Sequence, residues 1–237
     1  MIFNREISLI GEEAFEKLKN SSVAVFGLGG VGSFVCEALA RAGVGKLLIC
    51  DNDVIAPHNI NRQLFALHST VGKSKVEVAY QRLKYINPEI QIECKKQFFT
   101  SENAAEFNLN KYDFIADCID TVTSKLVLAK IAYEEGINII SCMGTGNKLN
   151  CVFKVSDITK TQVCPLCKVM RKLLKDNAIP HLTVVYSEEQ PLKPINKCEQ
   201  NQNKRQIPAS ISYVPSSAGL LLAGEIIKRL TAVKGQK

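Results

Sequence analysis

Near the amino terminus a β-rich run leads directly into a glycine loop, and few folds accommodate that combination. Ser22–Phe26 (SVAVF) is apolar and rich in β-branched residues, as is typical of a buried strand. The run is followed at once by a G-x-G-x-x-G spacing with one extra glycine, made by Gly27, Gly29, Gly30 and Gly32. A helical pattern then ends at Arg41–Ala42, where Gly43 supplies the stop. This order of strand, loop and helix predicts the start of an α/β domain.

The glycine loop has the composition of a phosphate-binding turn. Glycines let the backbone turn tightly and approach a phosphate with no Cβ in the way, and the next helix directs its free N–H groups at the anion. A second strand, Lys46–Cys50, ends in Asp51, where a carboxylate can accept hydrogen bonds from ribose hydroxyls. The alternative is a glycine turn tightened only for helix–strand packing. By itself the loop does not distinguish NAD from ATP.

Strands and helices continue to alternate along the chain, which predicts an α/β, Rossmann-like fold: a mostly parallel sheet with helices on both faces. Ser74 and Glu77 are expected to form a capping box at the start of a helix. The further strands are expected at 90–94, 113–118, 137–142, 151–155 and 183–187, and the further helices at 75–86, 123–135, 168–176 and 216–230. We expect one domain over 1–237, with a nucleotide-binding core (1–150), an appended C-terminal portion (151–237) and a mobile polar loop at 188–210.

Composition restricts the function classes. Apolar residues make up 46% of the 237-residue chain and charged residues 22%, which excludes a disordered or fibrous protein. The net charge of +7 is uneven, because residues 1–150 carry −1 and residues 151–237 carry +8. A basic portion attracts a polyanion such as RNA, and the alternative is an ordinary solvated lysine surface.

Targeting and redox features indicate a cytoplasmic protein. The amino terminus shows no signal-peptide pattern, and the longest uncharged stretch, Ile207–Gly224, contains two prolines and four serines, so no membrane span is expected. The nine cysteines are therefore expected to be reduced. One C-x-x-C pair, Cys164 and Cys167, is half of a four-cysteine zinc site. The spacing does not require zinc, although Cys151, Cys198 or His181 would be available to complete a site.

Other polar groups favour ATP over a dinucleotide. The long loop after the second strand contains Asn59, Asn61, Arg62 and Gln63. Lys73 and Lys75 stand at a helix start, where the dipole disfavours cations unless an anion lies between them. Asp120 follows a central strand, at the sheet edge where open α/β sheets bind ligands, and a carboxylate there can hold Mg²⁺. The ordinary alternatives are exposed lysines and a helix N-cap by Asp120.

In this order the motifs resemble the ubiquitin-activating-enzyme superfamily, whose ThiF-type domains adenylate a carboxylate with ATP and release pyrophosphate. The resemblance implies that Asp51, in a D-x-D pair with Asp53, holds the ribose. It implies that the Asn59–Gln63 motif, Asn59 and Arg62 above all, holds phosphates. Lys75 would neutralise the α-phosphate region, and Asp120 would bind Mg²⁺.

The first residues resemble a second motif of the same superfamily. Phe3-Asn4-Arg5 matches the start of an N-terminal segment whose arginine enters the active site of a partner subunit. The resemblance therefore implies a homodimer in which Arg5 acts in trans. The family usually has a further arginine shortly before this one, and here only two residues precede Phe3. The alternative is an exposed arginine on a fraying terminus.

The C-terminal third distinguishes between branches of the superfamily. Segments around Ser141–Leu149, Asp157–Thr161, Val184–Glu188 and Ser212–Gly219 resemble the branch that dehydrates threonylcarbamoyladenosine in tRNA. That resemblance implies a tRNA substrate, ATP-dependent ring closure, and association with a cysteine desulfurase or sulfur-acceptor system. The alternatives are activation of a ubiquitin-like sulfur carrier, with Cys164 and Cys167 as a remnant zinc pair, an NAD-dependent dehydrogenase, and a nucleotide-binding scaffold without catalysis.

Overall fold

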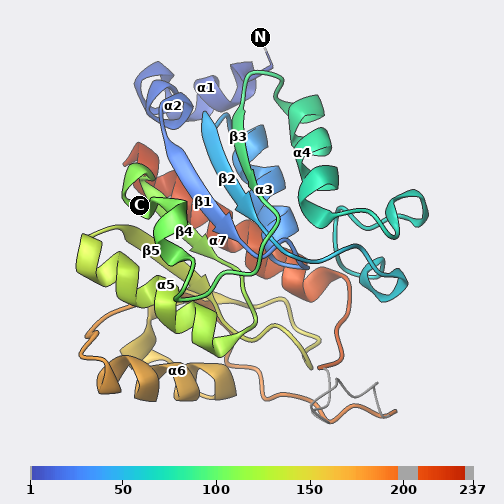
Figure 1. Cartoon of the computed structure of the whole chain (residues 1–237), viewed down its shortest axis with the longest axis vertical. Coiled ribbons are helices and arrows are strands. Elements are labelled where there is room, and N and C mark those ends of the chain that lie inside the picture. The colour runs from blue at the N-terminus through green and yellow to red at the C-terminus, as the bar shows by residue number, and fades with distance from the viewer. Residues whose placement is uncertain (1, 197–207, 233–237) are drawn as a thin grey trace.

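One sheet organises the molecule, in a computed structural model that describes residues 2–196 and 208–232. Its seven strands have the order β3-β2-β1-β4-β5-β7-β6 (Figure 1). All neighbouring pairs are parallel except β6 with β7, which are antiparallel. The strands are β1 (Ser22–Phe26), β2 (Lys46–Cys50), β3 (Gln91–Lys95), β4 (Phe114–Asp117), β5 (Asn138–Cys142), β6 (Lys154–Asp157) and β7 (Thr183–Tyr186).

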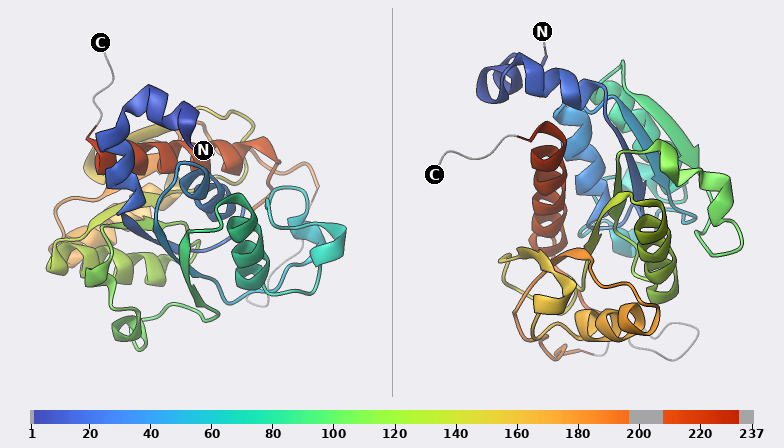
Figure 2. Two further views of the ribbon diagram at one scale, coloured as in Figure 1. Left: turned by 90° about the horizontal axis from the view of Figure 1, so that it is seen from above. Right: turned by 90° about the vertical axis from the view of Figure 1, so that its left-hand side faces the viewer.

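Helices cover both faces of this sheet, as the right-hand view of Figure 2 shows for α7 and α5. The side chains of β1 alternate between two apolar clusters: Val23 and Val25 pack with α3, α4 and α7, whereas Ala24 and Phe26 pack with α5. The helices are α1 (Asn4–Ile10), α2 (Glu12–Lys19), α3 (Gly32–Arg41), α4 (Lys75–Ile86), α5 (Val122–Glu135), α6 (Pro165–Asp176) and α7 (Tyr213–Thr231). Short 3₁₀ turns lie at Pro57–Asn59, His68–Thr70, Ala104–Phe107, Leu109–Lys111 and Ile158–Lys160.

The predicted α/β fold class is confirmed, and the main errors are local. The expected strand 151–155 is displaced to β6, because the carboxylate of Glu189 accepts hydrogen bonds from the backbone N–H groups of Leu149 and Asn150 (2.9 and 3.0 Å) and holds the approach to β6 as a loop. Helix α7 begins three residues before its expected start. Pro215 then lies in its first turn, where a missing N–H costs no helical hydrogen bond.

One further expectation was wrong, and one pair of helices was missed. The capping box does not form, since the Ser74 hydroxyl makes no capping bond, the backbone of Ser74 bridges to Val54, and Glu77 pairs with Lys96. No element was predicted before Ser22, and the structure shows that this segment forms α1 and α2. Their signal was the short amphipathic pattern that buries Phe15 and Leu18.

The C-terminal portion extends the same sheet. β7 pairs with β5 in parallel, from Ile140 with Thr183 to Cys142 with Val185.

The description of the chain as one domain stays a prediction, and the mobile loop expected at 188–210 lies partly outside the described residues. Within the part that the structure describes, no helix is long and apolar enough to cross a membrane.

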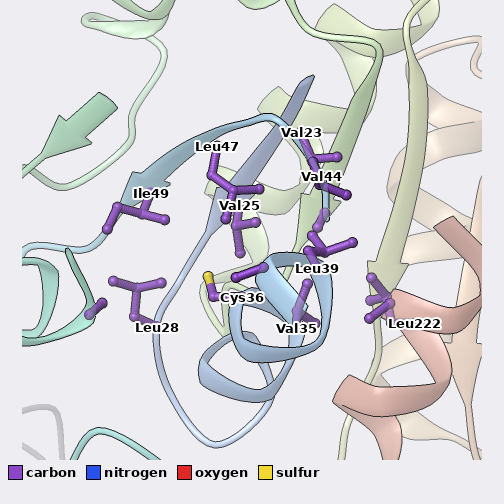
Figure 3. Close-up of a cluster of buried hydrophobic side chains, with 14 of the residues drawn as sticks. Val23, Val25, Leu28, Val35, Cys36, Leu39, Val44, Leu47, Ile49 and Leu222 are labelled. Atoms are coloured by element: carbon purple, nitrogen blue, oxygen red, sulfur yellow. The ribbon is translucent and has the colours of Figure 1, made fainter. Parts of the chain in front are cut away.

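Helix α7 packs closely against the start of α3, beside the glycine loop. Leu222 of α7 joins Val35 and Leu39 of α3 in the apolar cluster drawn in Figure 3. Gly219 makes the close approach possible, because a Cβ added there would lie 2.5 Å from the carbonyl oxygen of Val31. Gly224, in the same helix, has no atom within 4 Å of an added Cβ.

These two glycines give a matched pair of variants. Gly219→Ala should lower the free energy of unfolding by about 1–3 kcal/mol, because the methyl group forces α7 away from α3. Gly224→Ala should raise it by up to about 1 kcal/mol, because alanine loses less backbone entropy in a helix. Urea denaturation of both variants measures the difference, and equal midpoints would contradict the packing described here.

Candidate functional site

The glycine loop joins three strand ends at the carboxyl edge of the sheet. Gly27 has φ +86° and donates its N–H to the carbonyl oxygen of Cys50 (2.8 Å). A Cβ on Gly27 would lie 2.8 Å from the carbonyl oxygen of Cys118, and one on Gly32 would lie 1.7 Å from that of Gly27. Glycine is therefore required at both positions for β1, α3 and β4 to meet. No side chain of the described residues caps α3. The loop itself accepts from its first turn, because the N–H of Ser33 donates to the carbonyl oxygen of Gly29 and the N–H of Phe34 donates to that of Val31 (both 3.1 Å).

Asp51 fixes the glycine loop from the end of β2. One carboxylate oxygen accepts a hydrogen bond from the N–H of Leu28 (2.7 Å), and the other accepts one from the N–H of Asp53 (2.8 Å). Burial raises the pKa of the Asp51 carboxyl, and the nearby Lys75 ammonium and these two N–H groups act in the opposite direction. Only 8% of the side chain is exposed, so Asp51 both shapes the loop and borders the site.

The two lysines before α4 separate into different environments. Lys75 is buried and directs its ammonium group to Asp53 (2.7 Å) and Asp51 (3.8 Å). Lys73 is exposed, and its described contacts are through the backbone. The structure thus brings Lys75 to the glycine loop and leaves Lys73 outside it. The isolated bridge between Val54 and Ser74 holds the start of α4 against the loop that carries Asp53.

The loop after β2 places its polar residues around the glycines in different roles. Asn59 is buried and accepts a hydrogen bond from the N–H of Ala56 (3.0 Å), so it shapes the turn. Gln63 is buried, with its amide nitrogen 3.8 Å from the Cβ position of Gly29. Asn61 donates from its amide to the carbonyl oxygen of Ser210 (3.0 Å) and so joins this loop to the chain before α7.

Arg62 lies against the glycine loop as well. Its Cγ is 3.4 Å from the Cβ position of Gly30, on the same side as Pro215 of α7. Its guanidinium donates to the carbonyl oxygen of His58 (2.8 Å) and to the side chain of Asn61 (2.9 Å). Partial burial lowers the pKa of Arg62. Arginine remains protonated at any physiological pH, so Arg62 presents a fixed positive charge to an anion in the loop.

Asp120 is exposed on the turn that follows β4. Thr121, not Asp120, occupies the N-cap of α5, and no side-chain capping bond forms there. The contact recorded for the Asp120 carboxylate is a long one to the Thr121 hydroxyl (3.4 Å). The N-cap alternative is therefore wrong, and the exposed carboxylate projects at the same sheet edge as the glycine loop.

A buried ion pair supports that turn, and sequence reasoning missed it. Lys125 of α5 and Asp117 of β4 are 2.9 Å apart and both fully buried. Ser141 donates its hydroxyl to Asp117, and the other carboxylate oxygen accepts from the N–H of Ile119 (3.1 Å). The signal was present, since a lysine on the buried face of a helix needs an acidic partner. The network holds the Cys118–Ile119 turn that carries Asp120.

Arg5 lies far from the site of its own chain. It is exposed on α1, not on a fraying terminus, and α1 contains no buried residue. Phe3 packs on Phe15 of α2 (5.0 Å between ring centroids) and near Gly43, at the amino ends of the strands. Figure 1 shows α1 at the sheet edge opposite the carboxyl ends of β1 and β4.

The cysteines do not form a metal centre among the described residues. Cys164 and Cys167 are buried in an apolar cluster with Met143 and Met170. His181 pairs instead with Asp157 (3.2 Å), and Cys151 is exposed. No group of three or more potential metal ligands occurs in the described part of the chain, and Cys198 lies outside it. Burial raises the pKa of Cys142 to about 12, and that of Cys118 above its usual value, which fits the prediction that both are packing residues.

Comparisons with known proteins match nearly the whole chain. The profile of the ThiF family matches residues 3–237. A tRNA threonylcarbamoyladenosine dehydratase of Bacillus subtilis is 41% identical over 238 residues, covering 96% of this chain and 94% of that protein. The Escherichia coli protein of the same description is 34% identical over 74% of this chain and 66% of its own length. A crystal structure of the E. coli dehydratase in complex with ATP has a TM-score of 0.88 and 28% identity, covering 97% of this chain and 93% of that one.

Removal of Lys125 tests the buried pair. Lys125→Met should lower the free energy of unfolding by about 3–5 kcal/mol, because Asp117 would remain buried without its counter-ion. Lys130→Met, in the same helix, should change it by less than about 0.5 kcal/mol, because its pair with Glu134 (3.8 Å) is exposed. Urea denaturation compares the two variants. If Lys125→Met were as mild as Lys130→Met, the pair would not be stabilising the turn.

Proposed function

The chain belongs to the ThiF family, and on that premise we propose that it is an ATP-dependent dehydratase of threonylcarbamoyladenosine in tRNA. The observation that carries the proposal is the match to such dehydratases over nearly the full chain. The match includes the C-terminal portion, which adds β6, β7, α6 and α7 to the nucleotide-binding core. A dehydrogenase would share only the glycine loop with these proteins.

The proposed reaction activates a carboxylate and then closes a ring. The free carboxylate of the threonylcarbamoyl group attacks the α-phosphate of ATP, which forms an acyl-adenylate and releases pyrophosphate. A neighbouring atom of the same modification then attacks the activated carbonyl carbon. AMP leaves with one carboxylate oxygen, so the nucleoside loses the elements of one water. Ring closure within the substrate requires no enzyme thiol, consistent with the protonated state of Cys118 and Cys142 that burial favours.

The site has the groups that a triphosphate needs. The start of α3 directs the positive end of its helix dipole at the glycine loop, which favours an anion there, and Gly27 and Gly32 let the backbone approach it. Arg62 lies beside Gly30 and supplies positive charge that stabilises developing negative charge on phosphate. Lys75 now contacts Asp53, whose side chain is 57% exposed, and we infer that a phosphate exchanges for this carboxylate.

Asp120 is the proposed ligand for Mg²⁺. A carboxylate suits this ion because Mg²⁺ prefers oxygen ligands and binds through one or two carboxylates together with substrate phosphates. The support is its exposure, its lack of a capping role and its position on a turn held by Asp117 and Lys125. When bound, Mg²⁺ would neutralise phosphate charge, and Asp120 would orient the ion against the glycine loop.

The position of Arg5 supports a homodimer. Within one chain Arg5 stands at the amino edge of the sheet and cannot serve a site at the carboxyl edge. Leu9 of this helix (84% exposed) and Ile2 just before it (69% exposed) face solvent, and a second copy of the chain would cover them. We therefore keep the interpretation that Arg5 completes the site of a partner subunit.

The sulfur-carrier alternative has less support. It was motivated by Cys164 and Cys167, and these lie in an apolar cluster without further metal ligands among the described residues. Association with a cysteine desulfurase or sulfur-acceptor system stays a prediction from the resemblance. The tRNA substrate is favoured in addition by the net charge of +8 on residues 151–237.

Nucleoside mass spectrometry tests the function. Enzyme, ATP, Mg²⁺ and tRNA that carries threonylcarbamoyladenosine should give a nucleoside lighter by one water, with one pyrophosphate released per nucleoside. Asp120→Ala should lose at least about 100-fold in rate with an unchanged urea midpoint, because it removes only an exposed metal ligand. If the modified nucleoside kept its mass, or if pyrophosphate exchange required a carrier protein ending in Gly-Gly, the dehydratase assignment would be rejected.

Mixed subunits test the trans site. Arg5→Ala and Lys75→Ala should each be inactive alone, but a mixture should recover up to about a quarter of the activity, because random pairing leaves one intact site in half of the dimers. Dehydration rates after mixing measure the rescue, and exchange of differently tagged subunits is the control. Failure to recover activity despite confirmed exchange would exclude a shared site.

A further inference from the structure

We propose that the exposed face of α6 binds the phosphate backbone of tRNA next to the adenylation site. The face, here called the α6 basic face, consists of Lys168, Lys172 and Lys175, all exposed. The proposal rests on the proposed function and goes beyond it, because it assigns the surface on which the substrate lies. Phosphate contacts of this kind position a nucleic acid without reading its sequence.

Helical geometry places these lysines together. Their spacing of four and then three residues puts all three on one side of the helix, over about 10 Å of its length. The buried side of α6 carries Cys167, Met170 and Leu174 instead, which pack into the apolar cluster below. The α6 basic face is therefore directed away from the core and accessible to a large partner.

The requirements of the fold do not explain this arrangement. Lys168 and Lys172 are like charges at i, i+4, which destabilises a helix, and Lys168 lies in its amino-terminal half, where the dipole favours anions. Among the described residues no carboxylate pairs with any of the three lysines, and Asp176 in the same helix makes no ion pair either. A bound polyanion would supply the missing negative charge.

Some lysines elsewhere in the described residues pair with carboxylates, whereas others, such as Lys73 and Lys84, form no ion pair there. Lys17 of α2 pairs with Glu13, Lys130 of α5 pairs with Glu134, and Lys111 pairs with Glu93. The α6 basic face gathers three lysines without carboxylate partners among the described residues on one side of a single helix, which makes it a local concentration of uncompensated charge within the C-terminal portion. Such a concentration attracts nucleic acid because bound phosphates release their condensed counterions.

The helix begins at the edge of the sheet where the chemistry is proposed. The sulfur of Cys164 and the Cβ of Leu166 lie 3.9 Å from the Cβ position of Gly144, in the loop after β5. β5 pairs with β4, which ends at the turn that carries Asp120. From this edge α6 runs along the lower side of the molecule in Figure 1. A tRNA whose modified base enters the site would therefore extend its backbone across α6.

Neighbouring structure anchors the helix that carries the α6 basic face. Arg171 donates to the carbonyl oxygen of Thr161 (2.8 Å), which ties α6 to the 3₁₀ turn Ile158–Lys160. That turn adds a further exposed lysine, Lys160, with no carboxylate partner in the described residues. Because the helical backbone under these lysines is already ordered, binding costs less backbone entropy than it would for a flexible tail.

Charge-neutral variants test the proposal with a matched control. The triple variant Lys168→Gln, Lys172→Gln, Lys175→Gln removes three charges from α6, and Lys84→Gln, Lys111→Gln, Lys130→Gln removes three charges from other surfaces. Equilibrium binding of an unmodified tRNA transcript is measured at several salt concentrations, and KM and kcat are measured with modified tRNA. The α6 variant should bind roughly tenfold more weakly or worse, with a salt slope reduced by about 2–3, because each phosphate contact contributes about 1 to the slope.

The outcomes separate this proposal from the function. KM for tRNA should rise in parallel with the loss of binding while kcat stays within about twofold, and the control variant should match wild type. If wild-type enzyme removes water from the nucleoside but the α6 variant keeps its tRNA affinity and salt slope, only the α6 basic face is refuted. If no dehydration occurs but tRNA binding depends on α6, the proposed function fails and this proposal stands. An α6 variant that keeps tRNA affinity and loses binding of polyglutamate would refute it in favour of an acidic protein partner.

Discussion

Close backbone contact at the carboxyl edge of the sheet holds the site together. Gly27 lies against the carbonyl oxygen of Cys118, and Gly32 lies against the carbonyl oxygen of Gly27. Neither approach leaves room for a Cβ. The Gly27 N–H donates to Cys50 at the end of β2. Three strand ends and the start of α3 thereby converge on one point, and each delivers a different group to it. A side chain at either glycine would separate these elements, so the phosphate loop and the packing of the core are parts of the same arrangement.

Two lysines around this point are compensated by carboxylates of neighbouring elements. Lys75 is held by Asp51 and Asp53, and Lys125 is held by Asp117. The two pairs differ in accessibility: Asp53 is largely exposed, whereas Asp117 and Lys125 are fully buried. In the proposed function a phosphate would take the place of the Asp53 carboxylate, which is already in contact with water and so would cost little to release. The second pair would leave a buried charge if it opened, so it serves as a fixed support for the turn before α5.

The C-terminal portion is integrated with the nucleotide-binding core at several contacts. Pro215 of α7 lies beside Gly30, and Gly219 lies against Val31. The amide of Asn61 donates to the carbonyl oxygen of Ser210. The residues that distinguish the dehydratase branch therefore contact the glycine loop directly. At the other side of the sheet, α6 starts beside the loop after β5, which puts the basic surface and the adenylation chemistry at one edge.

Local patterns predicted the elements whose formation is governed by neighbouring residues. Continuous apolar runs located β1 and β2, and helical patterns located α3 and α4. The glycine spacing and Asp51 identified the nucleotide loop, because strand, turn and helix preferences act over a few residues. Long-range contacts decided the rest. They paired Lys125 with Asp117, separated Lys75 from Lys73, replaced the expected capping box with a bridge from Ser74 to Val54, and directed Arg5 away from its own site. Those outcomes follow from which side chains meet across the fold, and only the packed structure determines which buried charges find partners.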